Sequence, residues 1–336
     1  MAPSNGLSGT VRDGEQRHVT VQVPATTANL GAGFDAFGLA LEHHLVVRSV
    51  PYDHGADRLE VLDDGGVSTS EDNLIWRSLV ACCETFGAPV PDVGLRVRSR
   101  IPLQRGMGSS SAAIVAGITL GRELAGLRLA DQQVVELATE LEGHPDNVAP
   151  AVLGGLVACA RSDDGRLVVR RINPAPALRP LLLVPPQRQA TPTARAVLPD
   201  IVPAATMADQ AARAGHVLAA LSGLWPAAAA LSGDHLHEPA RAGVMPGSAA
   251  LLADLRADGH HAWLSGAGPS VAVAAPRSTA EAVAAVRRVA DRHGFATLVL
   301  DWDLSGARSC PDDGCGLAGT RDCIACPRQR LSCPDP

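Results

Sequence analysis

The pattern of apolar and polar positions predicts strands and helices in both halves of the chain. β-branched residues dominate residues 19–23, and apolar and basic residues alternate over residues 94–100, which is typical of strands. Residues 72–86 and 279–293 instead carry apolar side chains at helical spacing. Neither half shows regular strand–helix–strand repetition. We therefore expect an α+β protein with two lobes.

A stretch rich in glycine and serine separates the strand expected at 94–100 from a helix of small apolar residues. It contains Gly106 and Gly108, followed directly by three serines. Glycine permits positive φ and a close approach of the backbone to a ligand, and a helix N-terminus attracts anions. The stretch predicts a phosphate-binding loop; the alternative is a well-capped helix after a tight turn.

This loop does not follow the Walker A pattern, because no Gly-Lys-Ser/Thr sequence ends it. The chain of 336 residues contains no lysine at all, so the partner lysine of a protein-kinase glycine loop is also missing. Any phosphate chemistry must therefore rely on backbone amides, hydroxyl groups, arginine and a metal ion.

Two more loops contain closely spaced glycines. In the first, Asn29 and Asp35 flank Gly31 and Gly33, so that both polar side chains could point into a site. The alternative for this loop is a turn capped by its own Asx side chains. The second loop lies between two expected strands late in the chain and contains Ser265, Gly266 and Gly268.

A helix expected to end near residue 141 runs into the sequence ELEGHPDNVAP. Two acids and an amide at such a junction are suited to a divalent cation. The alternative is that Asp146 and Asn147 only cap the next helix while a glutamate faces solvent.

Composition limits the classes of partner. The formal charge of −6 argues against a nucleic-acid-binding surface. No apolar run reaches the roughly 18 residues that a membrane span needs. The first 16 residues lack the apolar segment of a secretory signal. We expect a cytoplasmic protein that binds neither nucleic acid nor membrane.

A run of prolines between residues 174 and 186 marks the best candidate for a domain boundary. We predict a disordered extension over residues 1–17 and a first lobe over 18–175, which contains the predicted phosphate-binding loop. A second lobe covers 176–303, and a cysteine-rich tail covers 304–336.

The tail has almost no apolar residues and cannot form a core. Its cysteines are Cys310, Cys315, Cys323, Cys326 and Cys333. One Cys-x2-Cys pair with flanking thiols could bind Zn²⁺, and disorder is the alternative. A disulfide framework is not expected in a cytosolic protein.

Together, the three glycine loops resemble the GHMP kinases, a superfamily of small-molecule kinases. The segments that carry the resemblance are PATTANLGAGFD, PLQRGMGSSSAA and SGAGPS. The chain looks most like the homoserine kinase family, which also shares EGHPDNVAP and the pairing of TARAVLP with HEPARAGVMPG. The likeness spans about residues 20–301.

This resemblance implies a two-lobed GHMP kinase fold with a ribosomal-protein-S5-like N-terminal lobe and an α+β C-terminal lobe. It also implies a homodimer. The activity it implies is phosphorylation of the side-chain hydroxyl of L-homoserine by ATP, a step of threonine biosynthesis.

The resemblance further implies an ATP phosphate loop and a Mg²⁺ site. The loop residues are Pro102, Leu103, Gln104, Arg105, Gly106, Met107, Gly108, Ser109, Ser110, Ser111 and Ala112. Ser109 or Ser110 would help to hold Mg²⁺ with one acid from the preceding helix end. Glu140 is preferred, because it opens the Glu-Leu pair that ends this helix in relatives, and Glu142 is the alternative.

For the acceptor, the resemblance implies that Asn29, Asp35 and Asn147 bind the amino and hydroxyl groups. Thr191, Arg195 and Arg241 would hold the carboxylate, which suits the guanidinium fork. The groups implied nearest the reacting hydroxyl are Asp35, Asp146 and Asn147, and none is assigned as a general base. Because Pro192 follows Thr191, we expect Thr191 to be extended.

Two other functions stay open at this point. The first is a GHMP kinase for another small alcohol, for which the two arginines would be unnecessary if the substrate lacked a carboxylate. The second is a non-catalytic sensor that binds nucleotide without turnover.

Overall fold

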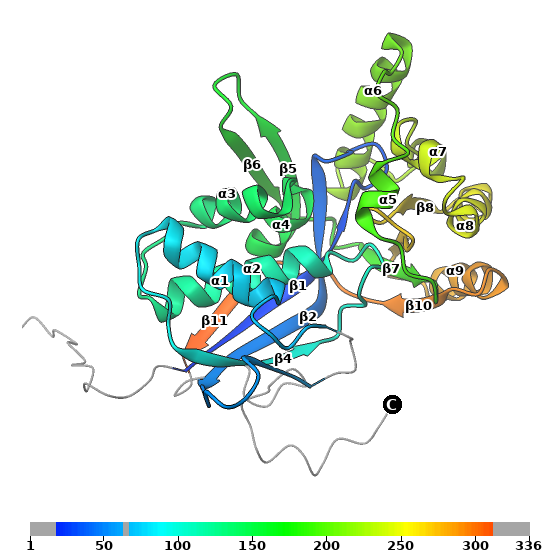
Figure 1. The fold of residues 1–336 in the computed structure, drawn as a ribbon. Helices are drawn as coiled ribbons and strands as arrows, with labels where there is room; N and C mark the ends of the chain where they lie inside the picture. Colours follow the sequence, from blue (N-terminus) through cyan, green and yellow to red (C-terminus); the bar gives the residue numbers. More distant parts are fainter. Residues whose placement is uncertain (1–17, 63–66, 312–336) are drawn as a thin grey trace, which may run out of the picture.

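The structure is a computed structural model and describes residues 18–62 and 67–311 (Figure 1). Within these ranges the chain forms two sheets with helices packed against them. The predicted α+β architecture with two lobes is thereby confirmed. No helix in the described ranges has the length and apolarity needed to cross a membrane.

The first lobe is built on a sheet with the strand order β11-β1-β2-β4-β3, to which β5 and β6 are joined through β2. Neighbouring strands are antiparallel except for the parallel pair β3 and β4. The strand expected at 19–23 is confirmed but extends further, up to the first glycine loop. The strands are β1 (Val19–Ala28), β2 (Phe37–Pro51), β3 (Leu59–Val61), β4 (Val93–Ser99), β5 (Leu156–Arg161) and β6 (Leu167–Ile172), with β11 described below.

The helices of this lobe are α1 (Leu74–Thr85), α2 (Ser109–Leu124), α3 (Asp131–Glu142) and α4 (Pro145–Leu153). α2 and α4 pack on β1 and β2, and α1 packs on α2. A Cβ atom on Gly117 would lie 2.2 Å from the carbonyl oxygen of Ile75, so the backbones of α1 and α2 are in contact. The small residues after the phosphate loop therefore bury α2 at the centre of the lobe.

The second lobe is built on an antiparallel sheet with the order β10-β7-β9-β8. Its strands are β7 (Leu178–Val184), β8 (His261–Leu264), β9 (Val271–Pro276) and β10 (Ala296–Val299). Its helices are α5 (Thr191–Arg195), α6 (Ala204–Leu221), α7 (His237–Arg241), α8 (Pro246–Ala257), α9 (Ala280–Arg292) and the 3-10 turn η1 (Ala229–Leu231).

The two lobes share an apolar core. Leu182 and Trp263 of the second sheet belong to the same buried cluster as the strands of the first. The indole Nε1 of Trp263, which is fully buried, donates a hydrogen bond to Thr27 Oγ1 over 2.9 Å. Because these contacts join the lobes behind the glycine loops, they fix the distance between the two walls of the cleft described below.

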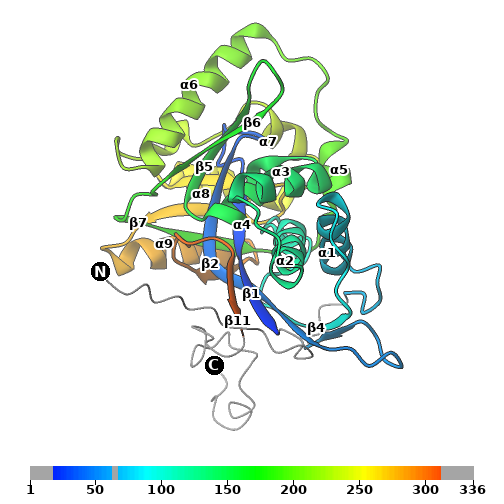
Figure 2. The ribbon, with the colours of Figure 1, turned by 90° about the vertical axis from the view of Figure 1, so that its left-hand side faces the viewer.

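The chain returns to the first lobe after β10, which differs from the boundary expected at residue 304. β11 (Arg308–Pro311) pairs with β1 in an antiparallel register, and Figure 2 shows it running alongside that strand. The buried Asp303 carboxylate accepts hydrogen bonds from the amides of Ser305 and Gly306 over 2.8 and 2.7 Å. The strand itself, RSCP, has no alternating apolar pattern, so the sequence did not predict it. Its pairing with β1 depends on backbone hydrogen bonds.

The rest of the cysteine-rich tail, from Cys315 onward, lies outside the described residues, as does the predicted extension at 1–17. Of the five tail cysteines, Cys310 in β11 lies within the described residues. The expectation of a Zn²⁺ site or of disorder in the tail therefore stays a prediction.

Candidate active site

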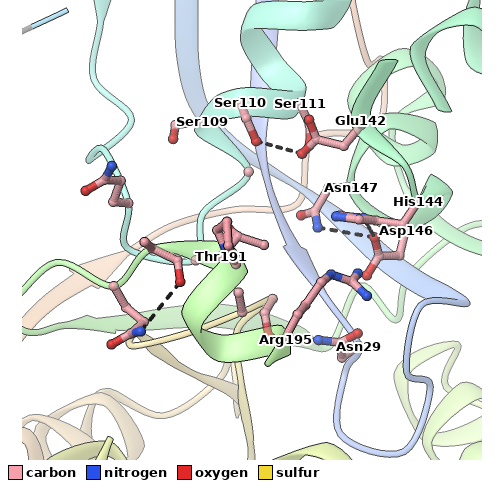
Figure 3. Close-up of a pocket in the computed structure, with 18 of the residues that line it drawn as sticks. Asn29, Ser109, Ser110, Ser111, Glu142, His144, Asp146, Asn147, Thr191 and Arg195 are labelled. Atoms are coloured by element: carbon pink, nitrogen blue, oxygen red, sulfur yellow. Dashed lines mark hydrogen bonds and ion pairs between the residues drawn. The ribbon is translucent and has the colours of Figure 1, made fainter. Parts of the chain in front are cut away.

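A cleft of about 270 Å³ lies where the two lobes meet. The first lobe supplies the first glycine loop, the phosphate loop, the end of α3 and the start of α4, and the second supplies α5, Arg241 and the last glycine loop. Figure 3 shows Ser110, Glu142 and Arg195 among the residues around this cleft. It is lined by Asn29, Asp35, Gln104, Gly106, Gly108, Ser109, Ser110, Ser111, Glu142, His144, Asp146, Asn147, Gln189, Ala190, Thr191, Pro192, Arg195, Arg241, Gly266 and Ala267. Most of the site residues expected from the sequence are therefore brought together.

The phosphate loop and the last glycine loop touch backbone to backbone. A Cβ atom on Gly106 would lie 2.2 Å from the carbonyl oxygen of Ser265, which no side chain tolerates. The Ser265 hydroxyl, fully buried, donates to the Gly106 carbonyl over 2.6 Å. Gly108 directly precedes the first residue of α2 and has φ +66. The first residues of α2 line the cleft, so the free amides at this end of the helix lie beside it. Ser265 is thus a structural residue of the loop pair.

Glu142, the last residue of α3, faces the serines at the start of α2. Its Oε1 atom accepts hydrogen bonds from Ser110 Oγ over 2.6 Å and from Ser111 Oγ over 2.9 Å. Ser109 also lines the cleft (Figure 3). Glu140 is exposed and is absent from the lining of the cleft within the described chain. The geometry thus favours Glu142, the alternative acid, over Glu140.

The donor atoms at this end of the cleft are a carboxylate and serine hydroxyl groups. Mg²⁺ is a hard cation that takes oxygen ligands and is often held by one or two carboxylates together with substrate phosphates. The residues present therefore fit a magnesium ion beside the phosphate loop.

Asp35 and Arg195 form an ion pair across the cleft. Arg195 Nη2 lies 2.7 Å from Asp35 Oδ1, and Nη1 lies 3.0 Å from Oδ2. The hydrogen bond to Asp35 raises the pKa of Arg195 more than partial burial lowers it. Each side chain remains 34% exposed, so a solute that enters the cleft can reach both groups.

Thr191 is not extended as expected but is the first residue of the short helix α5, and it lines the cleft. The restriction that proline imposes on the preceding residue is a preference. Here Pro192 lies in the first turn of the helix, where its missing N–H costs no hydrogen bond.

Arg241 is buried, with only 2% of its surface exposed, and its guanidinium holds three segments together. Nε donates to the Ala194 carbonyl over 3.0 Å, and Nη1 donates to the Gly266 carbonyl and to His237 Nδ1, each over 3.1 Å. A guanidinium can only donate, so His237 Nδ1 is an acceptor and its Nε2–H donates to the Gly31 carbonyl. Burial, followed by the charge of Arg195, lowers the pKa of Arg241.

Asn29 and Asn147 are both buried, and both side chains form hydrogen bonds with other groups of the protein. Asn29 Nδ2 donates to the Gly266 carbonyl over 2.8 Å, and its Oδ1 accepts from the Asp35 amide over 3.0 Å. Asn147 Oδ1 accepts from Thr26 Oγ1 over 2.8 Å. Asn29 therefore holds Asp35 in place against the last glycine loop, while Asn147 remains among the lining residues beside Asp146.

His144 is a site residue that the sequence reading missed. Its Nδ1 lies 2.5 Å from Asp146 Oδ1, and a ligand atom of Asp35 lies within 4.8 Å of those of both residues. Burial lowers the pKa of His144, but the hydrogen bond and charge of Asp146 together outweigh it, so the pKa is raised. The sequence feature that could have indicated His144 is the order His-Pro-Asp. It places His144 directly before α4 and two residues before the buried carboxylate of Asp146.

Five residues of the expected phosphate loop do not line the cleft. Met107 is a core residue with 1% exposure, and Arg105 points away toward the second lobe. The other three are Pro102, Leu103 and Ala112. The segment predicted as the phosphate loop thus contains residues that line the cleft and residues that pack behind them.

Comparison with models of known protein families identifies the class of protein to which the chain belongs. The model of the GHMP kinases N terminal domain matches residues 73–155, and that of the GHMP kinases C terminal domain matches residues 217–291. The fold is thus that of the GHMP kinases, and the chain is an ATP-dependent small-molecule kinase.

Individual relatives give the particular family. A homoserine kinase of Leifsonia xyli subsp. xyli is 40% identical over 87% of this chain and 91% of its own length. One of Thermus thermophilus is 43% identical over 75% of this chain and 85% of its own. The chain belongs to the homoserine kinase family, and the resemblance seen in the sequence is confirmed.

Solved structures agree with this assignment. The structure of a putative homoserine kinase from Listeria monocytogenes has a TM-score of 0.70 and 32% identity, and it covers 87% of this chain and 99% of its own. Homoserine kinase from Cytophaga hutchinsonii has a TM-score of 0.73 and 25% identity, with 89% and 99% covered.

Proposed function

We propose that the protein transfers the γ-phosphoryl group of ATP to the side-chain hydroxyl of L-homoserine. The observation that carries this proposal is the Arg195–Asp35 ion pair in a cleft whose other end holds the phosphate loop and Glu142. An α-amino acid offers the same two charges. Its ammonium can replace Arg195 on Asp35 while its carboxylate replaces Asp35 on Arg195, so that no charge is left unpaired when the acceptor enters.

The phosphate end of the cleft is suited to a nucleotide. The free amides and positive end of α2 favour phosphate oxygens, and Gly106 and Gly108 leave room for them. Ser109, Ser110 and Glu142 would hold Mg²⁺, which supplies charge neutralisation on the phosphates when it is bound. The absence of lysine is no obstacle, since amides, hydroxyl groups and the metal carry the same electrostatic role.

The chain's own residues mainly position the acceptor. Asn29 fixes the Asp35 backbone, Arg241 fixes the Ala194 end of α5, and Arg195 extends from this helix into the cleft. Phosphoryl transfer through a loose transition state asks little of the attacking hydroxyl, so positioning supplies most of the catalysis. Besides Glu142, the cleft is lined by the carboxylates of Asp35 and Asp146, on which the hydroxyl proton can be held.

ADP release with MgATP and a matched set of acceptors tests this function. The set contains L-homoserine, 4-hydroxybutyrate without the ammonium and 3-aminopropan-1-ol without the carboxylate. We expect turnover of L-homoserine only. Arg195→Ala should remove this preference, whereas Arg171→Ala should not, because Arg171 binds backbone carbonyls outside the cleft.

Two results would contradict the proposal. Turnover of an alcohol without a carboxylate but not of L-homoserine would indicate a GHMP kinase with another acceptor. Binding of MgATP without turnover of any acceptor would indicate a sensor. A homodimer, a cytoplasmic location and the lack of nucleic-acid and membrane partners stay predictions. The oligomeric state and the partners can be tested on the purified protein, and the location can be tested by fractionation of cells.

A further inference from the structure

Arg105 lies inside the phosphate loop, yet its side chain binds the second lobe. Nε donates to the Pro185 carbonyl over 2.8 Å, and Nη2 donates to the Pro186 carbonyl over 2.6 Å. Nη1 donates more weakly, over 3.5 Å, to the carbonyl of Leu103 in its own loop. The guanidinium thus directs its hydrogen bonds to backbone carbonyls and does not line the cleft.

A second contact lies directly beside the first. The Gln104 carbonyl accepts a hydrogen bond from the Gln189 amide over 2.9 Å. Gln104 has φ +55, a left-handed conformation that is uncommon for a residue with a side chain. Gln104 and Arg105 therefore hold both ends of the connector that runs from residue 185 to residue 190.

This connector links β7 to α5, the helix that carries Thr191 and Arg195. Pro185 and Pro186 restrict its backbone, so a shift at one end is passed along the chain. The far end of α5 is fixed by the hydrogen bond from Arg241 to Ala194. Figure 1 shows α5 at the junction of the lobes. The acceptor helix is thus attached to the phosphate loop by Arg105 and to the rest of its own lobe by Arg241.

We propose that Arg105 is a positioning residue that couples the nucleotide site to the acceptor site. Ordering of the phosphate loop by the nucleotide orders the connector and α5 through Arg105, so each ligand tightens the binding of the other. The identity of the acceptor in this proposal rests on the proposed function. The coupling itself rests on the contacts of Arg105 and Gln104.

Calorimetric titration of L-homoserine, with and without Mg²⁺ and the non-hydrolysable analogue AMP-PNP, measures this coupling. In the wild-type protein we expect the analogue to lower the Kd of L-homoserine about tenfold, within the usual range for coupled sites. In Arg105→Ala the ratio should fall to about threefold or less, because only the backbone hydrogen bond from Gln189 to Gln104 then joins the loop to the connector, while the Kd of the analogue alone changes by less than about threefold. Because the coupling of two binding sites is reciprocal, L-homoserine should lower the Kd of AMP-PNP by the same factor.

Two further variants separate coupling from a loss of folding. Arg105→Lys keeps one donor for one of the two carbonyls and should retain part of the coupling. Arg171→Ala is the matched control, because Arg171 also binds two carbonyls, those of Leu153 and Leu304, outside the cleft. Its coupling ratio should equal that of the wild type. Thermal melting of all variants monitors folding.

Hydrogen exchange supplies a readout that needs no acceptor. With Mg²⁺ and AMP-PNP, amides of residues 187–196 should exchange more slowly in the wild type, and this protection should be much smaller in Arg105→Ala. If wild-type protein shows this protection yet neither binds nor phosphorylates L-homoserine, the proposed function fails while the coupling stands. An unchanged coupling ratio in Arg105→Ala would overturn the proposal. Weaker binding of the analogue with the coupling retained would do so too, since it would make Arg105 a direct phosphate ligand.

Discussion

Arg195 on α5 donates two hydrogen bonds to the Asp35 carboxylate of the opposite lobe, over 2.7 and 3.0 Å. The two residues are 160 positions apart in sequence. Since both remain partly exposed, screening by solvent keeps the contribution of the pair to folding small. Its position in the cleft indicates a role in selecting a ligand that carries both charges.

Asp35→Asn should reduce kcat/KM for L-homoserine by about 10- to 100-fold, because a hydrogen bond to a charged group contributes about 1.5–3 kcal/mol. The free energy of unfolding should change by about 1 kcal/mol or less, because exposed ion pairs add little to stability. Steady-state kinetics and urea unfolding of the same preparation measure both quantities.

Asp209→Asn is a matched control for this variant. Asp209 forms an ion pair with Arg213 on the exposed side of α6, away from the cleft, so its kinetics should equal those of the wild type. Equal kinetic losses in the two variants, or a large loss of stability with unchanged kinetics in Asp35→Asn, would contradict the acceptor role.

Glu142→Gln should weaken the magnesium site while Glu140→Gln should not. Glutamine keeps the acceptor for Ser110 and Ser111 but lacks the charge that a divalent cation needs. We expect kcat to fall about 100-fold or more in Glu142→Gln, the usual cost of losing one transition-state electrostatic contact. Titration of activity with Mg²⁺ should require a higher concentration for half-saturation in this variant. The opposite ranking of the two glutamates would restore Glu140 as the ligand.

The choice between these glutamates shows where the sequence was informative and where it was not. The three glycine loops were visible because glycine and serine are needed at those positions for backbone reasons, as at Gly106 against Ser265. Glu140 and Glu142 differ by two positions, or about 200° around a helix. Only one of them can face the serines, and residue types alone do not give the rotation of α3 relative to α2.

Other features depended on distant contacts. The pairing of β11 with β1 uses backbone groups, and the turn of Arg105 toward Pro185 and Pro186 depends on the packing of the two lobes. His144 resembled any histidine in a loop until the fold buried Asp146 beside it. Local conformational requirements could thus be predicted from the sequence, while contacts between residues that depend on the tertiary fold could not.

His144→Gln should remove a pH-dependent part of the folding free energy. The pKa of His144 is raised above 6.5 in the folded protein despite burial, because Asp146 stabilises the protonated ring. A raised pKa means that this stabilisation is fully present below the unfolded value of 6.5 and is lost as pH rises through the folded pKa. The wild type should therefore exceed the variant in stability most at about pH 5.5, and the difference should shrink toward about pH 9.

Urea unfolding of the ligand-free protein across this range measures the difference. His293→Gln is a control, since His293 pairs with Asp254 on the far side of the second lobe and does not line the cleft. A difference between wild type and His144→Gln that grew with pH would contradict the assigned hydrogen bond.

Asp303→Asn should destabilise the fold without affecting the active site. The carboxylate is 2% exposed and accepts hydrogen bonds from the amides of Ser305 and Gly306, and it lies 2.9 Å from His44 Nε2. Loss of this buried charge should cost about 2–4 kcal/mol. Burial raises the pKa of Asp303. The hydrogen bonds from His44 and from the two amides lower this pKa by more than burial raises it, so the net shift is downward.

A lowered pKa means that the contribution of Asp303 is present above 3.8 and is lost as pH falls through the folded pKa. The gap in unfolding free energy between wild type and Asp303→Asn should therefore be constant near neutral pH and close only in acid. The Kd values of L-homoserine and AMP-PNP should stay within about twofold of the wild type, since the residue is remote from the cleft. A large change in either Kd at unchanged stability would mean that the strand after Asp303 acts on the active site and not only on the fold.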